Sequence, residues 1–190
     1  MTEIIKGSNT GGGFSADAAI AQNLPLESSD IIGRAWGFVT NDTIDRSVKE
    51  LVHLLVGSAG LGSNLLLNIG PTPQGEVRQS HRERLLGIGN WMKTYGETIY
   101  GTRKSFMKLA DWGVAVEKGD KVYLHIIRPE KLNKELILNQ FPYKVKKVYR
   151  FETGKTVDSK TDNVASAVSL KLTDLDPKAI DNVIVLQVTK

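Results

Sequence analysis

The chain has 190 residues, of which 41% are hydrophobic, and a formal net charge of +4 from 25 basic and 21 acidic side chains. This composition predicts a soluble globular protein with a core of one large or two small domains, and it excludes disorder as the default. The charges are scattered along the chain, so we expect no nucleic-acid partner. The absence of cysteine excludes disulfides, thiolate metal sites and a nucleophilic thiol.

Residues 1–30 contain no basic start followed by an apolar run, so we predict no signal peptide and no membrane span. The compartment is left open, with the cytoplasm and the periplasm both compatible. The segment "SNTGGGFS", residues 8–15, is typical of a flexible connection. The three histidines are too isolated to match a metal-ligand spacing, and we expect neither a metal ion nor a cofactor.

A first helix is predicted to begin near Thr43 and to end by Gly60 or Gly62. The prediction rests on apolar residues at helical spacing, namely Val48, Leu51, Val52 and Leu55. The next segment, "SNLLLNIG" at 63–70, is a short apolar run that periodicity alone cannot separate from a buried helix. Its length and the flanking glycines favour a strand.

A second helix is predicted within residues 76–97, with Gly96 well placed to end it. Its expected apolar face consists of Leu85, Ile88, Met92 and Tyr95. A helix, a buried strand, a loop and a helix in succession are typical of a parallel α/β sheet that is covered on both faces.

From about residue 103 the pattern changes to short alternating segments separated by turns. Val122, Leu124 and Ile126 share one side of a predicted strand, and residues 167–172 and 183–188 form further strands. These signals indicate an antiparallel sheet or sandwich. The predicted fold class is therefore α/β followed by all-β, with an α/β piece at 1–102 and a β-sandwich domain at 103–190.

Four ordered motifs before residue 103 resemble one known family. They are "LESSDIIGRAWGF" (26–38), "SVKELVHLLV" (47–56), "NLLLNIGPTPQGEV" (64–77) and "RLLGIGNWMKTYGETIYGT" (84–102). This stretch resembles the C-terminal part of the catalytic barrel of the α-L-fucosidases, the retaining glycoside hydrolases of family 29. In that family a β-sandwich follows the barrel, so the resemblance implies a partial (β/α)8-barrel remnant followed by an antiparallel β-sandwich.

The resemblance implies retaining hydrolysis of terminal α-L-fucose from a fucosylated oligosaccharide or glycoside. An aspartate attacks the anomeric carbon and a second carboxyl group protonates the leaving oxygen, with the two groups about 5 Å apart. In the family the nucleophile lies on an earlier barrel strand, so we expect this chain to begin too late to contain it. The usual acid/base position, counted back from Trp36, falls in "SNTGGG", which has no carboxylate.

Two residues of the first motif are candidates for the site by resemblance. Glu27 matches a glutamate that recurs beside the sugar in the family, and it is the catalytic candidate for proton transfer; the alternative is a structural carboxylate. Asp17 and Glu3 are weaker candidates. Trp36 matches an aromatic residue that lies against the bound fucose, and an apolar sugar face packs well on an indole. The alternative for Trp36 is a core tryptophan.

The turn "GPTPQG" at 70–75 follows the predicted strand, where the loops of a parallel barrel form the active-site face. Asn68, at the end of that strand, is a candidate for supporting the substrate. The alternative, a rigid turn that aims the next helix, is favoured because proline and glycine need only backbone reasons to be there. We predict surface or hydrogen-bonded structural roles for all three histidines, His53, His81 and His125.

One or two barrel strands alone would leave unpaired backbone edges and the apolar side chains of residues 65–67 exposed. Three arrangements would cover them: another chain that carries the rest of the barrel, self-association into a homo-oligomer, or refolding of the α/β piece against the sandwich. Self-association is favoured for a chain that is stable alone. The alternative to a fucosidase is a non-catalytic module that acts in oligomerisation or weak carbohydrate binding.

Overall fold

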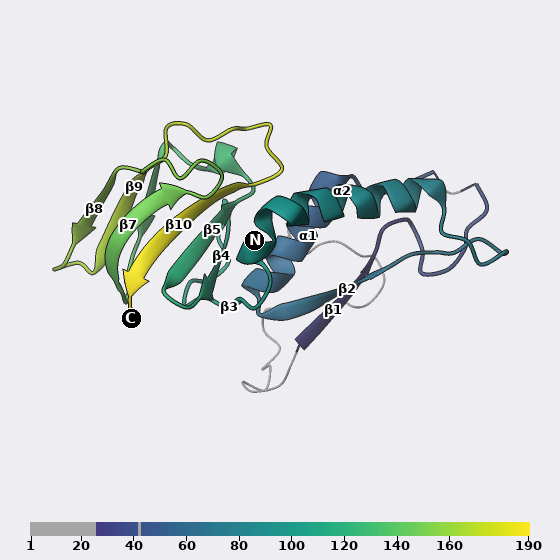
Figure 1. Ribbon diagram of the computed structural model, residues 1–190, viewed down its shortest axis with the longest axis horizontal. Coiled ribbons are helices and arrows are strands. Elements are labelled where there is room, and N and C mark those ends of the chain that lie inside the picture. Colours follow the sequence, from purple (N-terminus) through teal and green to yellow (C-terminus); the bar gives the residue numbers. More distant parts are fainter. Residues whose placement is uncertain (1–25, 42) are drawn as a thin grey trace. The chain divides into compact units, whose positions relative to one another are not determined.

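The computed structural model describes residues 26–41 and 43–190 (Figure 1). The chain divides into two compact units, residues 1–99 and residues 100–190, named here the first unit and the second unit. The described part of the first unit alternates strands and helices, whereas the second unit is built from strands and a short 3₁₀ helix, Pro129–Lys131. This order of elements confirms the predicted α/β part followed by an all-β part.

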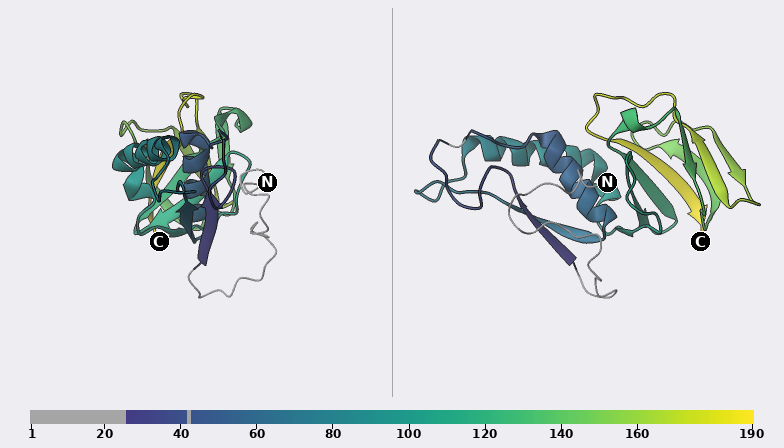
Figure 2. Two further views of the ribbon diagram at one scale, coloured as in Figure 1. Left: turned by 90° about the vertical axis from the view of Figure 1, so that its right-hand side faces the viewer. Right: turned by 180° about the vertical axis from the view of Figure 1, so that it is seen from behind.

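The described part of the first unit is a two-stranded parallel ribbon with two helices. β1 (Leu26–Ile31) pairs with β2 (Ser63–Asn68), and the last residues of the two strands lie opposite each other. α1 (Val48–Gly60) connects them and lies over β2 (Figures 1 and 2). The strand predicted over 63–70 is thus confirmed, while β1 is an additional strand that the sequence pattern did not indicate.

The ribbon is covered on one face and open on the other. Ser28 and Ser63 are buried and their hydroxyl oxygens lie 2.8 Å apart in a hydrogen bond. On the opposite face Glu27 is exposed, and so is Leu66, with 44% of its surface accessible. Leu65 is half-buried. The apolar run of β2 is therefore less completely buried than a strand inside a closed barrel, as expected for an incomplete sheet.

α1 begins five residues after the predicted start, at Val48. Ser47 caps it: the Ser47 hydroxyl accepts from the Glu50 backbone N–H at 3.2 Å, and the Ser47 backbone N–H donates to the Glu50 carboxylate at 2.7 Å. The hydrogen bonds from Ser47 lower the pKa of Glu50. The prediction of a start near Thr43 was wrong because residues before Ser47 are hydrogen-bonded elsewhere: the Arg46 backbone N–H donates to Ile32 O at 3.0 Å.

α2 (Gln79–Tyr95) ends at Gly96 as predicted, and a 3₁₀ turn (Gly96–Thr98) follows. Its buried side chains are His81 and Trp91, whereas Leu85, expected on the apolar face, is 40% exposed. The surface of α2 around Gly87 packs closely against α1, since a Cβ on Gly87 would lie 2.5 Å from Val48 Cγ2. Among the described residues, neither helix is long and apolar enough to cross a bilayer.

The second unit consists of two antiparallel sheets. The five-stranded sheet has the strand order β3 (Arg103–Lys104), β4 (Gly113–Lys118), β5 (Lys121–Ile126), β10 (Asn182–Thr189) and β7 (Lys144–Arg150). The three-stranded sheet has the order β6 (Glu135–Leu138), β9 (Ala167–Lys171) and β8 (Ser159–Asp162).

The core of the second unit lies between these two sheets. Val122, Leu124 and Ile126 of β5 point into it, as their alternation predicts, and Leu170 of β9 faces them from the other sheet. Trp112 belongs to the same core. Two sheets that bury their facing side chains form a sandwich, and this part of the predicted fold class is confirmed.

Candidate functional site

The carboxyl ends of β1 and β2 lie at the same edge of the ribbon, because the strands are parallel and Ile31 is opposite Asn68. From β1 the chain continues into the segment 32–47, and from β2 into the turn 70–75. In parallel α/β folds, loops at this end of the strands form the binding face. The two loops are therefore the candidate site.

These two loops contact each other closely. The Asn68 side chain donates a hydrogen bond from Nδ2 to Trp36 O at 2.8 Å. Gly70 packs against the backbone of Gly37, since a Cβ on Gly70 would lie 2.7 Å from Gly37 O. Trp36 is 41% exposed on this shared surface, and Phe38, two residues further along the chain, is exposed as well. Two of the three predicted site residues, Trp36 and Asn68, are thus brought together.

The turn 70–75 is closed by its own hydrogen bonds. Thr72 N donates to Glu76 O at 2.8 Å, and Gly75 N donates to Thr72 O at 2.9 Å. Gly75 has a φ of 82°, a conformation that favours glycine. These contacts give backbone reasons for the turn's composition, in agreement with the interpretation as a rigid turn.

Glu27 lies elsewhere on the ribbon. It is exposed in the amino-terminal half of β1, opposite Asn64. Ile31, at the other end of the strand, is four positions further on, which corresponds to about 13 Å at the rise of an extended chain. Trp36 and Asn68 meet at the carboxyl end, so Glu27 is not brought to them. The weaker candidates Asp17 and Glu3 lie outside the described residues.

A buried carboxylate that the sequence analysis did not select lies near the candidate site. Asp30, in β1, is 7% exposed, and its Oδ1 is 2.7 Å from Arg46 Nη1. The same oxygen accepts from Ile31 N at 2.7 Å. Arg46 N donates in turn to Ile32 O. The polar segment "LESSDI" gives no pattern from which this ion pair could have been found.

A second buried pair joins the segment before α1 to α2. His81 is 1% exposed, and its Nε2 lies 3.1 Å from Asp45 Oδ1 and 3.1 Å from Arg78 Nη2. His81 therefore has the hydrogen-bonded structural role that the sequence predicts. Among residues 26–41 and 43–190, no group of three His, Cys, Asp or Glu side chains could hold a metal ion.

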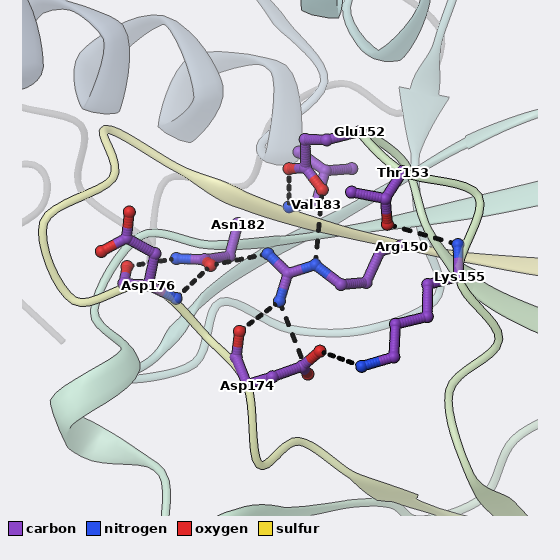
Figure 3. Close-up of polar contacts among 8 residues, drawn as sticks. All are labelled: Arg150, Glu152, Thr153, Lys155, Asp174, Asp176, Asn182 and Val183. Atoms are coloured by element: carbon purple, nitrogen blue, oxygen red, sulfur yellow. Dashed lines mark hydrogen bonds and ion pairs between the residues drawn. The ribbon is translucent and has the colours of Figure 1, made fainter.

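In the second unit, Arg150 is the centre of a polar cluster at one end of β10 (Figure 3). Its guanidinium group donates to Asp174 O at 2.7 Å and to Asn182 Oδ1 at 3.1 Å, and it lies 3.6 Å from the Glu152 carboxylate. The hydrogen bond from Lys155 lowers the pKa of Asp174. These contacts fasten the loop before β10 to β7, so the cluster has a structural explanation.

Another buried pair of the second unit joins β5 to the residue before β10. His125 Nδ1 and Asp181 Oδ2 are 2.6 Å apart, and both side chains are fully buried. This pair gives His125 the hydrogen-bonded structural role that was predicted, in place of a surface position.

Comparison with known proteins relates these features to one family. The family model "Alpha-L-fucosidase" matches residues 14–97. The tissue α-L-fucosidase of Mus musculus is 37% identical over 90 residues, which are 46% of this chain and 18% of that protein. The chain thus spans less than a fifth of the length of this relative.

Solved structures show the same similarity over a larger part of the chain. An α-L-fucosidase isoenzyme 1 from Paenibacillus thiaminolyticus matches with a TM-score of 0.74 and 26% identity, over 88% of this chain and 40% of that one. The Thermotoga maritima α-fucosidase in complex with fucose matches with a TM-score of 0.72 and 26% identity, over 86% and 40% of the two chains. These matches agree with the predicted combination of a partial barrel and a sandwich.

Proposed function

Because the chain is related in sequence and fold to the α-L-fucosidases, glycoside hydrolase family 29, we propose that it acts in the retaining hydrolysis of terminal α-L-fucose. Residues 1–102 correspond in this proposal to the C-terminal portion of the catalytic barrel, and residues 103–190 to the C-terminal sandwich domain. The observation that carries the proposal is the exposed indole of Trp36, held on joined loops at the carboxyl ends of two parallel strands. Active sites of barrel enzymes lie at this end.

Trp36 is proposed as the surface on which the sugar packs. An indole offers a rigid apolar face with a low entropy cost, and the methyl-bearing face of fucose is complementary to it. Asn68 Nδ2 is engaged by Trp36 O. Its Oδ1 accepts no hydrogen bond from the described residues and is free to accept from a sugar hydroxyl group. The same side chain can therefore support both the loop and the substrate.

The reaction needs two carboxyl groups about 5–5.5 Å apart. Glu27 stays the candidate for proton transfer in this proposal, and its position opposite Asn64 means that a sugar on Trp36 must extend along the open face of the ribbon to reach it. The Asp30 carboxylate already forms an ion pair with Arg46, so it is not a candidate for the second catalytic group. We therefore propose that the nucleophile is supplied by a further barrel segment, and that turnover depends on it.

The open face of the ribbon and the exposed side of α2 are the proposed contact surfaces for that segment or for a second copy. Leu66 of the ribbon is 44% exposed, Leu86 of α2 is 59% exposed, and Val77, just before α2, is 44% exposed. Exposed apolar side chains of this size in one small unit are typical of an interface. Self-association into a homo-oligomer, or association with a chain that carries the rest of the barrel, would cover them.

The test is release of nitrophenol from nitrophenyl α-L-fucoside by the intact chain, alone and with the remaining barrel of a related fucosidase supplied in trans. Glu27→Gln should lower the rate about 10²–10⁴-fold, the usual contribution of a general acid. Ser29→Ala is the matched control, because Ser29 is exposed two residues further along the same strand.

Turnover that is lost in Glu27→Gln and kept in Ser29→Ala supports the proposal with Glu27 as the acid. Equal rates for Glu27→Gln and the unchanged chain would show that Glu27 takes no part in proton transfer and has a structural role. Fucose binding without turnover under both conditions would identify a carbohydrate-binding module instead. The absence of both fucose binding and turnover would contradict the proposed function.

A further inference from the structure

From the contacts around segment 32–47 we infer that Asp45 and His81 are positioning residues for Trp36. They act through the loop that carries the indole and do not touch substrate themselves. This inference rests on the proposed function in so far as Trp36 is the sugar-binding surface. Its structural content, that the buried Asp45–His81 contact fixes the Trp36 loop, is independent of any ligand.

The Asp45–His81 contact is buried on both sides. The side chain of His81 is 1% exposed and that of Asp45 7%, and Nε2 lies 3.1 Å from Oδ1. Nε2 also lies 3.1 Å from Arg78 Nη2, and the other ring nitrogen, Nδ1, is buried without a partner among the described residues. A buried carboxylate is costly unless it is paired. Asp45 is therefore held where His81 and α2 place it.

Arg46, the next residue, is fixed from three directions. Its backbone N–H donates to Ile32 O at 3.0 Å, its guanidinium group pairs with Asp30 at 2.7 Å, and its carbonyl oxygen accepts from Arg84 Nε at 2.9 Å. β1 and α2 thus converge on the two residues 45 and 46. Together these contacts close the base of the loop.

The other end of the loop surface is held by β2 and its turn. Asn68 Nδ2 binds Trp36 O, and Gly70 fits against Gly37 only because it has no side chain. Trp36 itself is 41% exposed, so much of its ring has no packing partner in the described part of the chain. A half-exposed side chain is positioned by the anchoring of its backbone more than by packing, and loss of an anchor allows local opening.

The experiment is ¹⁹F NMR on the full chain labelled with 5-fluorotryptophan. The chain has three tryptophans, so Trp91 and Trp112, both buried, serve as internal references in the same spectrum. Asp45→Ala should move the Trp36 signal toward that of free fluorotryptophan and leave the other two unchanged. Asp45→Asn keeps a side chain of the same shape that can hydrogen-bond to His81 Nε2, and it should restore the Trp36 signal.

Ser63→Ala is the matched control for a general loss of stability. It removes a buried hydrogen bond, Ser28 to Ser63, in the same ribbon but at the amino end of β2. It should lower the unfolding temperature without moving the Trp36 signal. If Asp45→Ala does not fold, Arg84→Met removes one anchor while keeping the aliphatic stem, and it should shift the Trp36 signal in the same direction.

An unchanged Trp36 signal in the folded Asp45→Ala or Arg84→Met chain overturns the inference, and so does an equal shift in Ser63→Ala. Titration with L-fucose separates this result from the proposed function. If the binding-competent loop falls to a tenth of its population, the apparent dissociation constant rises about tenfold. A shifted Trp36 signal with unchanged fucose affinity overturns the positioning role, whereas absence of fucose response in the unchanged chain counts against the proposed function alone.

Discussion

The two units of the chain differ in how their sheets are covered. In the second unit, the five-stranded and three-stranded sheets face each other and bury residues such as Leu124 and Leu170 completely. In the first unit, a two-stranded ribbon has helix α1 over β2 on one side, while Leu66 on the other face is 44% exposed. A sheet must bury its apolar face against another layer, and in the described part of the chain only the second unit has both layers.

The side chains of the strands have different roles in the two units. In the second unit, alternate residues of strands such as β5 and β9 point into a core. The ribbon of the first unit instead contains polar side chains, such as Asp30 and Asn68, that are engaged in specific contacts at its carboxyl end. Stability is therefore expected to reside in the sandwich, and positioning of the candidate site in the ribbon and its loops.

The largest expected effect is in the core of the sandwich. Leu124→Ala removes a side chain with no exposed surface and should lower the free energy of unfolding by about 2–5 kcal/mol. Leu66→Ala, the same change on the open ribbon, should cost less than about 1 kcal/mol at dilutions where the chain is monomeric. Urea unfolding of both variants measures the contrast, and equal losses would show that the ribbon is as well covered as the sandwich.

Two glycines of α2 test the packing of the helix pair. Gly87→Ala places a Cβ 2.5 Å from Val48 Cγ2, and overpacking of this kind costs about 1–3 kcal/mol. Gly89→Ala meets no atom within 4 Å and should stabilise the helix by about 0.5–1 kcal/mol. Thermal unfolding should thus shift in opposite directions. A gain of stability from both changes would mean that α1 and α2 do not pack as described.

A smaller effect is expected at Glu117 of β4. Burial raises the pKa of this carboxyl group, but hydrogen bonds from Lys190, Tyr143 and Ser105 outweigh burial and leave the pKa below 4.5. A lowered pKa in the folded state stabilises the fold above the pKa of the unfolded chain, and this stabilisation is lost as the pH falls through the folded pKa. Glu117→Gln should therefore be less stable than the unchanged chain at neutral pH.

The difference in unfolding free energy between these two chains should shrink as the pH is lowered below 4.5. Measuring unfolding by circular dichroism across that range checks it. Ser105→Ala, which removes one of the hydrogen bonds but keeps the carboxylate, is the control and should retain most of the pH dependence. A difference that is constant from neutral to acidic pH would contradict the account of Glu117.

The smallest effect is expected at the start of α1. Glu50→Ala removes the carboxylate that accepts from Ser47 N and completes the capping box. Loss of a capping interaction costs about 0.5–2 kcal/mol, and the exposed position favours the lower end. Lys49→Ala, at the neighbouring position, should change the unfolding temperature less than Glu50→Ala. The reverse order would be inconsistent with the capping box.

Much of this fold could be predicted because its signals are local. The 63–68 strand, the end of α2 at Gly96 and the alternation of residues 122–126 follow from spacing and turn residues. β1 was missed because "LESSDI" has no apolar period. The start of α1 was misplaced because Arg46 is bonded to β1, and Leu85 was misassigned because Gly87 determines which face of α2 meets α1.

The candidate site was predictable in part. Trp36 was selected by resemblance and Asn68 from its place at the end of the predicted strand, but their contact joins residues 32 positions apart. The contact between Asp45 and His81 spans 36 positions. No local pattern encodes such pairs, since they arise when separate elements pack. The sequence therefore indicated which residues border the site. The contacts between them become visible only in the tertiary structure.

The claim that the first unit is incomplete without further layers is tested most directly by the mass of the intact chain in solution. The monomer has a mass of 20.9 kDa. Multi-angle light scattering on the purified chain should give a multiple of this mass, and Leu66→Lys, which places a charge on the open ribbon, should shift it toward the monomer. A well-folded monomer for the unchanged chain, with a cooperative unfolding transition, would contradict the account.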